Sequence, residues 1–189
     1  GGVYLATVAG WPIIAIGAAS LVAALGYTGG PTPYGYRGLG EVFVFVFFGL
    51  AATVGSRFAH DGTAPLDAWL LAVPLGMLVT AILVANNVRD IDTDRPAGKR
   101  TLAVLLGRRR TRHLYALLML GGFPLIGWFA AAGWTPGLTA IAVAAAPLAV
   151  VPVRVVYRET AGPALIGALK ANAAVHALTG ALLGLGAAL

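Results

Sequence analysis

Cysteine is absent from this 189-residue sequence, and charged residues make up only 11% of it. Without cysteine, the chain has neither a disulfide framework nor a thiolate metal site. A soluble domain ordinarily has about a quarter of its residues charged, so the shortage of charge excludes an ordinary water-exposed surface. Hydrophobic residues account for 59% of the chain, and the mean hydropathy is +0.85. The composition therefore predicts a protein embedded in lipid.

Long stretches without charge separate the few charged residues. Residues 1–36 and 68–88 contain none, and residues 113–153 contain only a histidine that is neutral at pH 7. A transmembrane helix needs about 20 such residues. Cutting the chain at its charges and at its glycine and proline clusters predicts an all-α, polytopic bundle of six transmembrane helices. Their expected ranges are 3–27, 41–57, 66–87, 113–132, 137–156 and 163–188.

The stretch from Glu41 to Phe48 alternates β-branched and aromatic residues, which in a soluble protein would indicate a strand. Both faces of the stretch are apolar, however, whereas a strand of a membrane barrel alternates apolar with polar residues. Only helices and closed barrels satisfy backbone groups in lipid. We therefore predict a helix here as well.

Basic residues gather in alternate connections between the predicted helices. Three connections contain eleven Lys or Arg residues between them, whereas the opposite connections contain only Arg57. Because cytoplasmic loops are enriched in Lys and Arg, the three basic connections are expected to face the cytoplasm. A membrane surface or an anionic ligand explains this clustering better than nucleic acid does. The three connections are 28–40, 88–112 and 154–162.

Three of the seven acidic residues fall within five positions, at Asp90, Asp92 and Asp94. Asn86, Asp90 and Asp94 are spaced i, i+4, i+8, so a helix that continues through them places all three on one face. Asp92 would then point elsewhere. Oxygen ligands of this kind suit Mg²⁺, which keeps several waters and is usually completed by substrate phosphates. We interpret Asn86, Asp90 and Asp94 as magnesium ligands.

Cations surround these carboxylates, namely Arg89, Arg95, Lys99 and Arg100. Metal ligands mixed with cations favour a diphosphate, which is held through metal on one side and through ammonium or guanidinium groups on the other. The alternative is a solvated loop whose charges neutralise one another, and this is the better interpretation for Arg108–Arg110 and Arg112. Glu41 and Glu159 belong to no clustered, helix-spaced arrangement.

A second loop at the same predicted end contains Tyr34, Tyr36 and Arg37. One interpretation is a rigid turn with interfacial tyrosines. The other is a functional loop whose phenols hydrogen-bond a diphosphate or face a developing cation. Its predicted position on the same side as the aspartates keeps the functional interpretation open.

Three polar residues, Lys170, Asn172 and His176, lie in the last predicted helix. Polar groups at membrane depth are costly and are functional candidates by default. Interhelical hydrogen bonding is the simpler interpretation, and their roles stay open.

Two strings of residues resemble the UbiA prenyltransferase superfamily, most closely its dihydroxynaphthoate branch. The string from Asn86 to Gly107, NNVRDIDTDRPAGKRTLAVLLG, is similar to the second aspartate-rich motif of the family. The string from Gly30 to Leu50, GPTPYGYRGLGEVFVFVFFGL, resembles a loop and the helix that follows it. The resemblance implies a nine-helix fold in which residues 1–189 are one transmembrane domain contributing the six C-terminal helices. The first aspartate-rich motif of the family would precede Gly1, which agrees with the missing initiator Met.

The resemblance also implies a reaction, the Mg²⁺-dependent transfer of a polyprenyl group from an allylic polyprenyl diphosphate to 1,4-dihydroxy-2-naphthoate in menaquinone synthesis. The implied location is the bacterial cell membrane, with membrane lipid as a partner and no nucleic acid. Another aromatic acceptor stays open as an alternative. A membrane transporter is the alternative from a different class, although transporters usually place charge at the bilayer midplane. The oligomeric state and the prenyl chain length are not implied.

Site residues carried over from the family fall into three groups. The implied metal ligands are Asn86, Asp90 and Asp94. The implied diphosphate-binding residues are Asn86, Arg95, Lys99 and Arg37. The implied catalytic residues are Asp90, Asp94, Tyr34, Tyr36 and Arg37. The isoprenoid tail would lie between helices, beside Phe43, Phe45, Phe47 and Phe48, although contact with lipid is the simpler role for most of these rings.

Overall fold

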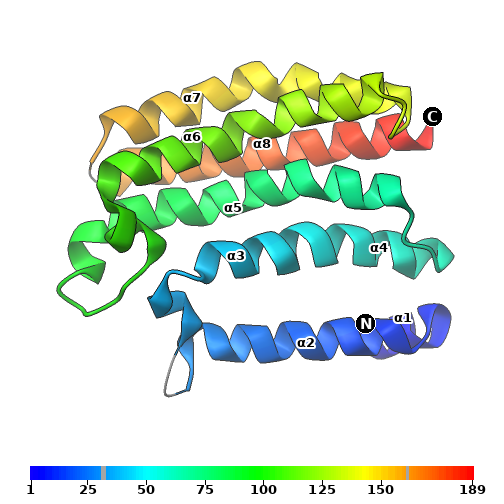
Figure 1. Ribbon diagram of the computed structural model, residues 1–189, viewed down its shortest axis with the longest axis horizontal. Coiled ribbons are helices and arrows are strands. Elements are labelled where there is room, and N and C mark those ends of the chain that lie inside the picture. Colours follow the sequence, from blue (N-terminus) through cyan, green and yellow to red (C-terminus); the bar gives the residue numbers. More distant parts are fainter. Residues whose placement is uncertain (31–32, 161) are drawn as a thin grey trace.

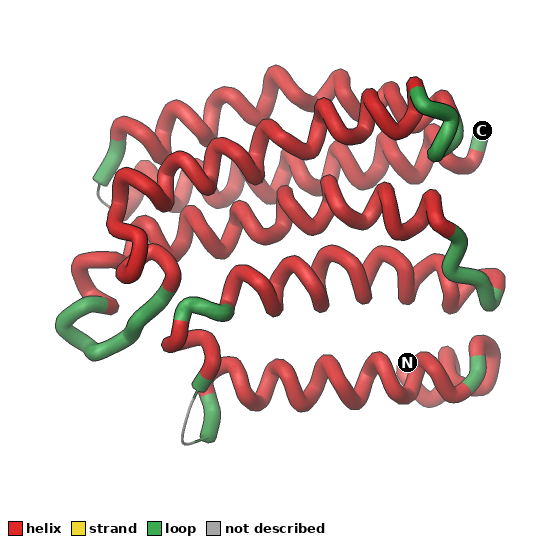
Figure 2. The backbone as a smooth tube through the Cα atoms, viewed as in Figure 1, coloured by secondary structure: helices red, strands yellow, loops and turns green. Residues whose placement is uncertain are grey.

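The computed structural model describes residues 1–30, 33–160 and 162–189, which form an all-helical bundle (Figures 1 and 2). Six helices among these residues are long and apolar enough to cross a membrane, so the predicted number of spans is confirmed. The spans are Trp11–Thr28 (α2), Gly40–Asp61, Leu66–Asp94 (α5), Leu102–Ala131 (α6), Gly137–Arg158 and Gly162–Ala188 (α8). The span Gly40–Asp61 consists of α3 (Gly40–Val44), a π-helical segment (Phe45–Ala51) and α4 (Ala52–Asp61). The span Gly137–Arg158 consists of a 3₁₀ segment (Gly137–Ala145) and α7 (Ala146–Arg158).

The prediction of one continuous helix over 3–27 is wrong at its start. The short helix α1 (Gly2–Ala9) ends at Gly10, whose φ of 84° is open to glycine but strained for other residues. The chain reverses there, and α1 lies against α2 and α4 (Figure 1). Pro12 occupies the first turn of α2, where its missing N–H group removes no helical hydrogen bond.

The strand-like stretch from Glu41 to Phe48 is helical, as predicted, but part of it widens into the π-helical segment. Gly49 of this segment packs directly on Gly76 of α5, and a Cβ atom at Gly49 would overlap the Gly76 backbone. Phe45 covers the same glycine, because a Cβ at Gly76 would lie 2.9 Å from the Phe45 ring. Small residues thus allow the two helices to approach closely.

α5 is the central helix of the bundle and packs against α6, α8 and the span Gly40–Asp61. α2 contacts mainly α1 and the short turn Tyr34–Arg37, and it lies at the edge of the bundle in Figure 1. The hydrophobic core consequently follows α5, α6 and α8. Its fully buried side chains include Leu78, Val84, Val88, Tyr115, Met119, Ile126 and Leu165.

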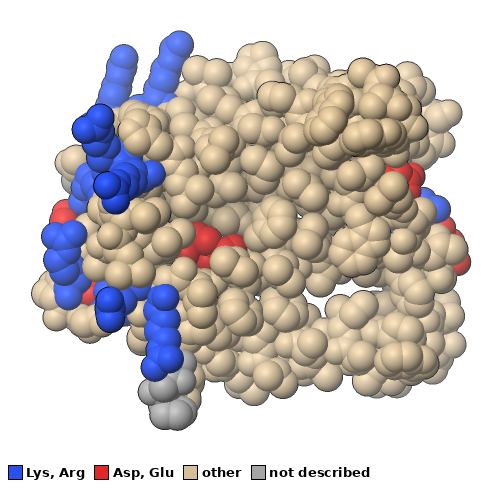
Figure 3. Space-filling model, viewed as in Figure 1, with Lys and Arg blue, Asp and Glu red and all other residues tan. Residues whose placement is uncertain are grey.

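The three basic connections lie at one end of the bundle, where most Lys and Arg side chains gather in Figure 3. The predicted bounds of the middle connection, 88–112, are wrong, because α5 continues to Asp94 and α6 already begins at Leu102. The connection itself is only 95–101. Gly107 interrupts the helical backbone of α6 with a φ of 76°, so the arginines that follow it begin a new helical stretch.

Candidate functional site

Asn86, Asp90 and Asp94 share one face of α5, which we call the acid face, because the helix is unbroken through Asp94. Asp94 is only 6% exposed, whereas the Asp90 side chain is about one-third exposed. Asp92 lies off this face, as its spacing predicts. Its side chain is 76% exposed, and its Oδ2 lies 2.7 Å from Nη2 of Arg108.

Each carboxylate of the acid face forms a salt bridge with a cationic side chain. Lys99 Nζ lies 3.0 Å from Oδ1 of Asp94. Arg89 donates twice to Asp90, from Nε to Oδ1 at 2.7 Å and from Nη2 to Oδ2 at 2.9 Å. The hydrogen bond to Asp94 raises the pKa of the Lys99 ammonium, so this group stays charged throughout the neutral range. Both cations are of the kind that phosphate oxygens also accept as partners.

The loop that contains Tyr34, Tyr36 and Arg37, which we call the tyrosine loop, packs against the connection 95–101. The backbone N–H of Arg100 donates to the carbonyl of Tyr36 at 3.0 Å. Lys99 Nζ lies 5.3 Å from the centroid of the Tyr36 ring, within the range of a cation–π interaction. The structure therefore brings Tyr36, Lys99 and Asp94 together. Pro31 and Thr32, which belong to the same family-like string, lie outside the described residues.

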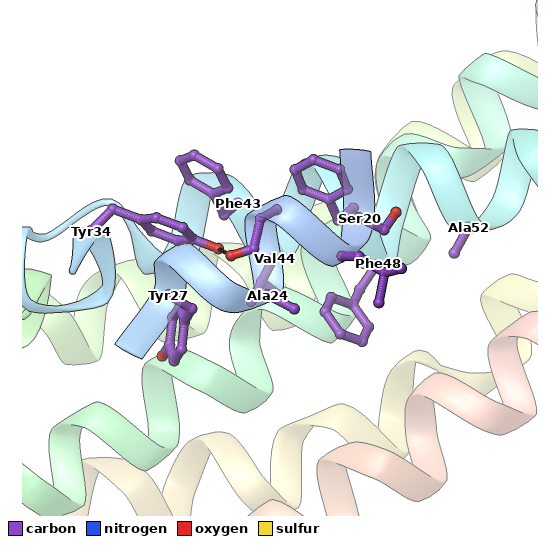
Figure 4. A pocket seen from close by; sticks show the side chains of 11 residues that line it. Ser20, Ala24, Tyr27, Tyr34, Phe43, Val44, Phe48 and Ala52 are labelled. Carbon is purple, nitrogen blue, oxygen red and sulfur yellow. Dashed lines mark hydrogen bonds between the residues drawn. The ribbon is translucent and has the colours of Figure 1, made fainter. Parts of the chain in front are cut away.

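Tyr34 points toward α2, beside Ala24 (Figure 4). Its hydroxyl donates to the carbonyl of Ala23 at 2.5 Å, and its ring stacks on Phe43 with centroids 3.7 Å apart. Burial raises the pKa of the Tyr34 phenol, which keeps it a hydrogen-bond donor at neutral pH. Arg37 and Arg95 are exposed, and neither forms a salt bridge with any described residue.

Two apolar cavities extend from this end into the bundle. The inner cavity, about 320 Å³, begins at Asn86 and lies among α3, the π-helical segment, α5 and α8. The outer cavity, about 680 Å³, lies between α2 and the span Gly40–Asp61, with Tyr27 and Tyr34 in its wall (Figure 4). Val44 and Phe48 line both cavities. Phe43 and Phe47 line the outer one, whereas Phe45 packs on Gly76 instead.

Sequence reasoning missed the pair Glu41 and Asn87. Asn87 Nδ2 donates to Oε1 of Glu41 at 2.9 Å, and the two residues are only 8% and 6% exposed, respectively. Glu41 stands in no cluster along the chain because its partner follows 46 positions later. The sequence does contain one indication of a special role for Glu41. It is the single charged residue between Arg37 and Arg57, in an otherwise apolar segment.

The remaining polar residues singled out in the sequence have structural contacts. Arg108 Nη1 donates to the Val88 carbonyl of α5 at 2.8 Å, and Arg112 Nη2 donates to the Glu159 carbonyl at the end of α7 at 2.6 Å, so these arginines join α6 to two neighbouring helices. Asn172 is fully buried, and with its side-chain amide turned by 180° it donates to the Leu78 carbonyl at 3.3 Å and accepts from the Ile82 N–H at 3.1 Å on α5. This orientation agrees with the interpretation of interhelical hydrogen bonding. Lys170 is exposed, and buried Nδ1 of His176 has no hydrogen-bond partner among the described residues.

The donor set of the acid face can be compared with the requirements of magnesium. Mg²⁺ is usually bound by one or two carboxylates, with waters and substrate phosphates completing six ligands. The acid face supplies two carboxylates and one amide. No group of three or more acidic or histidine side chains that could hold a metal ion occurs in the described part of the chain. The residues therefore fit a magnesium ion that is shared with a phosphate ligand.

Fold and site together define an integral membrane protein whose basic end suits the anionic head of an amphiphile and whose cavities suit its apolar tail. The chain belongs to the UbiA prenyltransferase family, and the match covers residues 1–166. It is 41% identical over 170 residues to the 1,4-dihydroxy-2-naphthoate octaprenyltransferase of Mycobacterium leprae, covering 89% of this chain and 56% of that protein.

Other relatives carry the same description. The Mycobacterium tuberculosis protein is also 41% identical over 170 residues, with 89% of this chain and 57% of that protein covered. The Escherichia coli protein is 40% identical over 150 residues, with 76% of this chain and 47% of that protein covered. The chain thus spans about half the length of these relatives. No solved structure matches it.

Proposed function

We propose that the protein transfers a polyprenyl group from an allylic polyprenyl diphosphate to 1,4-dihydroxy-2-naphthoate, with Mg²⁺, and so forms demethylmenaquinol, the reduced form of demethylmenaquinone. The observation that carries the proposal is the position of Asn86, which belongs to the acid face and also lines the inner cavity. The head and the tail of one prenyl diphosphate thereby have adjoining sites. Homology to 1,4-dihydroxy-2-naphthoate octaprenyltransferases supports both substrates.

The cations of the basic end are the groups that bind the diphosphate in this proposal. Lys99 and Arg89 already donate to the acid face, and Arg95 directly follows Asp94. Arg37 comes from the docked tyrosine loop. Their charge-assisted hydrogen bonds stabilise the negative charge that grows on the diphosphate as the allylic carbon to oxygen bond breaks. Bound Mg²⁺ would supply Lewis-acid stabilisation of the same charge.

The aromatic and apolar walls act on the other product of bond breaking, the allylic cation. The Tyr36 ring lies under Lys99, so a shift of Lys99 toward the diphosphate would open this π face to the cation. The apolar lining of the cavities disfavours the water that would otherwise capture the cation. A ring carbon of the acceptor then attacks the allylic carbon, and the acceptor loses its carboxylate as carbon dioxide.

Residues 1–189 act as a single transmembrane domain in this proposal, and the basic end faces the cytoplasm. The absence of native cysteine allows single-cysteine labelling. Ala97 is exposed in the connection 95–101, and Ala64 is exposed at the opposite end. In intact cells, we expect an impermeant maleimide to label Ala64→Cys and to leave Ala97→Cys unlabelled until the membrane is opened. The reverse pattern would show that the orientation is inverted.

Activity is best measured on an extended protein, in which this chain is fused to the remaining segment of the Mycobacterium tuberculosis relative. In this proposal the first aspartate-rich motif lies in that segment, as the family resemblance implies. Prenyl transfer to 1,4-dihydroxy-2-naphthoate by the extended protein, with Mg²⁺ and with the metal removed, is the test of the proposed function.

A further inference from the structure

We propose that Glu41 accepts a hydrogen bond from a hydroxyl group of the aromatic acceptor and thereby positions the acceptor ring beside the allylic diphosphate. This inference rests on the proposed function. It assigns a specific role to a buried carboxylate that lies outside both aspartate-rich motifs.

The two oxygens of Glu41 have different surroundings. Oε1 accepts the hydrogen bond from Asn87 Nδ2 at 2.9 Å. Oε2 is buried and has no hydrogen-bond partner among the described residues. Buried polar atoms in native proteins are nearly always paired, and a carboxylate in its ionised form only accepts hydrogen bonds. In that form Oε2 requires a donor, and nothing in the described part of the chain supplies one.

The neighbours of Glu41 belong to the acid face and to the two cavities. Its hydrogen-bond partner Asn87 directly follows Asn86, which lines the inner cavity. Val44, one helical turn further along the same span, lines both cavities. On the outer side, a Cβ atom at Gly40 would lie 3.4 Å from the Tyr27 ring and 3.6 Å from its hydroxyl oxygen. Glu41 itself lines neither cavity, so a ring bound at Val44 would lie one helical turn from Glu41, and the proposed contact requires the ring to reach past Val44 to Oε2.

Of the groups that the proposed substrates contain, only the acceptor hydroxyls can donate a hydrogen bond to Oε2. The diphosphate group offers acceptor oxygens and carries negative charge, so a carboxylate repels it. The polyprenyl tail has no polar atom. The aromatic acceptor also carries one carboxylate, but unlike the other two groups it has two phenolic O–H groups, which are donors of the kind that Oε2 requires. Such a contact also orients the ring, because a site built to hydrogen-bond a hydroxyl rejects analogues that lack it.

Glu41→Gln in the extended protein tests this contact. Glutamine keeps the size of the side chain and an oxygen for Asn87, but it replaces the other oxygen with an NH₂ donor. We expect the KM for 1,4-dihydroxy-2-naphthoate to rise about 10- to 100-fold, as for a lost hydrogen bond to a charged group. The KM for the prenyl diphosphate and the Mg²⁺ requirement should stay within about twofold of wild type. Glu159→Gln, the same change at an exposed glutamate of the basic end, should alter neither KM.

Acceptor analogues supply a test that requires no variant. Methylation of the hydroxyl that Glu41 holds should weaken binding to the wild type about 10- to 100-fold. The same methylation should cost Glu41→Gln nothing further, because the contact is already lost. Binding is followed by tryptophan fluorescence with the 1-methoxy and the 4-methoxy analogue, each in the absence of prenyl diphosphate.

Three outcomes would overturn the proposal. The first is wild-type binding of both methoxy analogues as tight as that of the dihydroxy compound. The second is an unchanged acceptor KM in Glu41→Gln. The third is a Glu41→Gln variant that loses only its Mg²⁺ or diphosphate dependence, which would make Glu41 a metal-side residue. If the extended protein with Glu41 intact transfers no prenyl group, the proposed function is contradicted. The fluorescence titration with the methoxy analogues would then still test the role of Glu41.

Discussion

Asp94→Ala in the extended protein should lower kcat/KM for prenyl transfer by about 1,000-fold or more, because a metal ligand contributes several kcal/mol of transition-state charge stabilisation. Asp94 is the most buried carboxylate of the motif and is bonded to Lys99 at 3.0 Å. Its removal takes away an oxygen ligand and also frees Lys99 from its position over Tyr36. Asp90→Ala should cause a loss of the same order.

Asp92→Ala is the matched control. Asp92 is exposed, lies off the acid face and bonds only Arg108 among the described residues. Its loss should leave kcat/KM within about tenfold of wild type, since exposed ion pairs contribute little. Steady-state rates with saturating Mg²⁺ and thermal unfolding in detergent separate catalysis from folding. Equal losses, or equal tolerance, in the three variants would contradict the assignment of a metal-binding face.

The 189-residue chain alone should form no detectable prenylated product, even when it inserts correctly. A prenyl diphosphate brings about three negative charges, which must be held from more than one direction as the carbon to oxygen bond breaks. Asp90 and Asp94 approach from the end of one helix only. The family resemblance assigns the opposing ligands to the first aspartate-rich motif, which this chain does not contain.

Addition of the segment from the Mycobacterium tuberculosis relative, fused or co-expressed, should restore Mg²⁺-dependent transfer. A matched control is the same segment in which the acidic residues of its aspartate-rich motif are replaced by alanine. This control should insert and leave the chain inactive. Formation of demethylmenaquinol by the purified chain alone would contradict the two-motif account.

Those features of the fold that depend on local composition could be predicted from the sequence. Uncharged runs of about 20 residues give the six spans. The i, i+4, i+8 spacing of Asn86, Asp90 and Asp94 gives the acid face because α5 does continue through it. The prediction that the tyrosine loop and the aspartates lie at one end follows from counting spans, and the contact between Tyr36 and Arg100 bears it out.

Features that depend on contacts between distant residues could not be predicted in the same way. The hydrogen bond between Glu41 and Asn87 joins two spans and leaves no local pattern. Tyr34 and Tyr36 are two residues apart, yet only Tyr36 faces Lys99, because packing on Phe43 and Ala23 directs Tyr34 toward α2. The reversal at Gly10 was overlooked because hydrophobicity alone does not register a backbone turn.

The central claim is tested most directly by the product that the extended protein forms in liposomes. The mixture contains 1,4-dihydroxy-2-naphthoate, a single-ring hydroxybenzoate and an all-trans polyprenyl diphosphate, and mass spectrometry identifies the product. The account predicts demethylmenaquinol, or demethylmenaquinone after its oxidation by air, with Mg²⁺, none after chelation with EDTA, and full recovery when excess Mg²⁺ is restored. Undiminished product formation in EDTA, or prenylation of the hydroxybenzoate in place of the naphthoate, would contradict it.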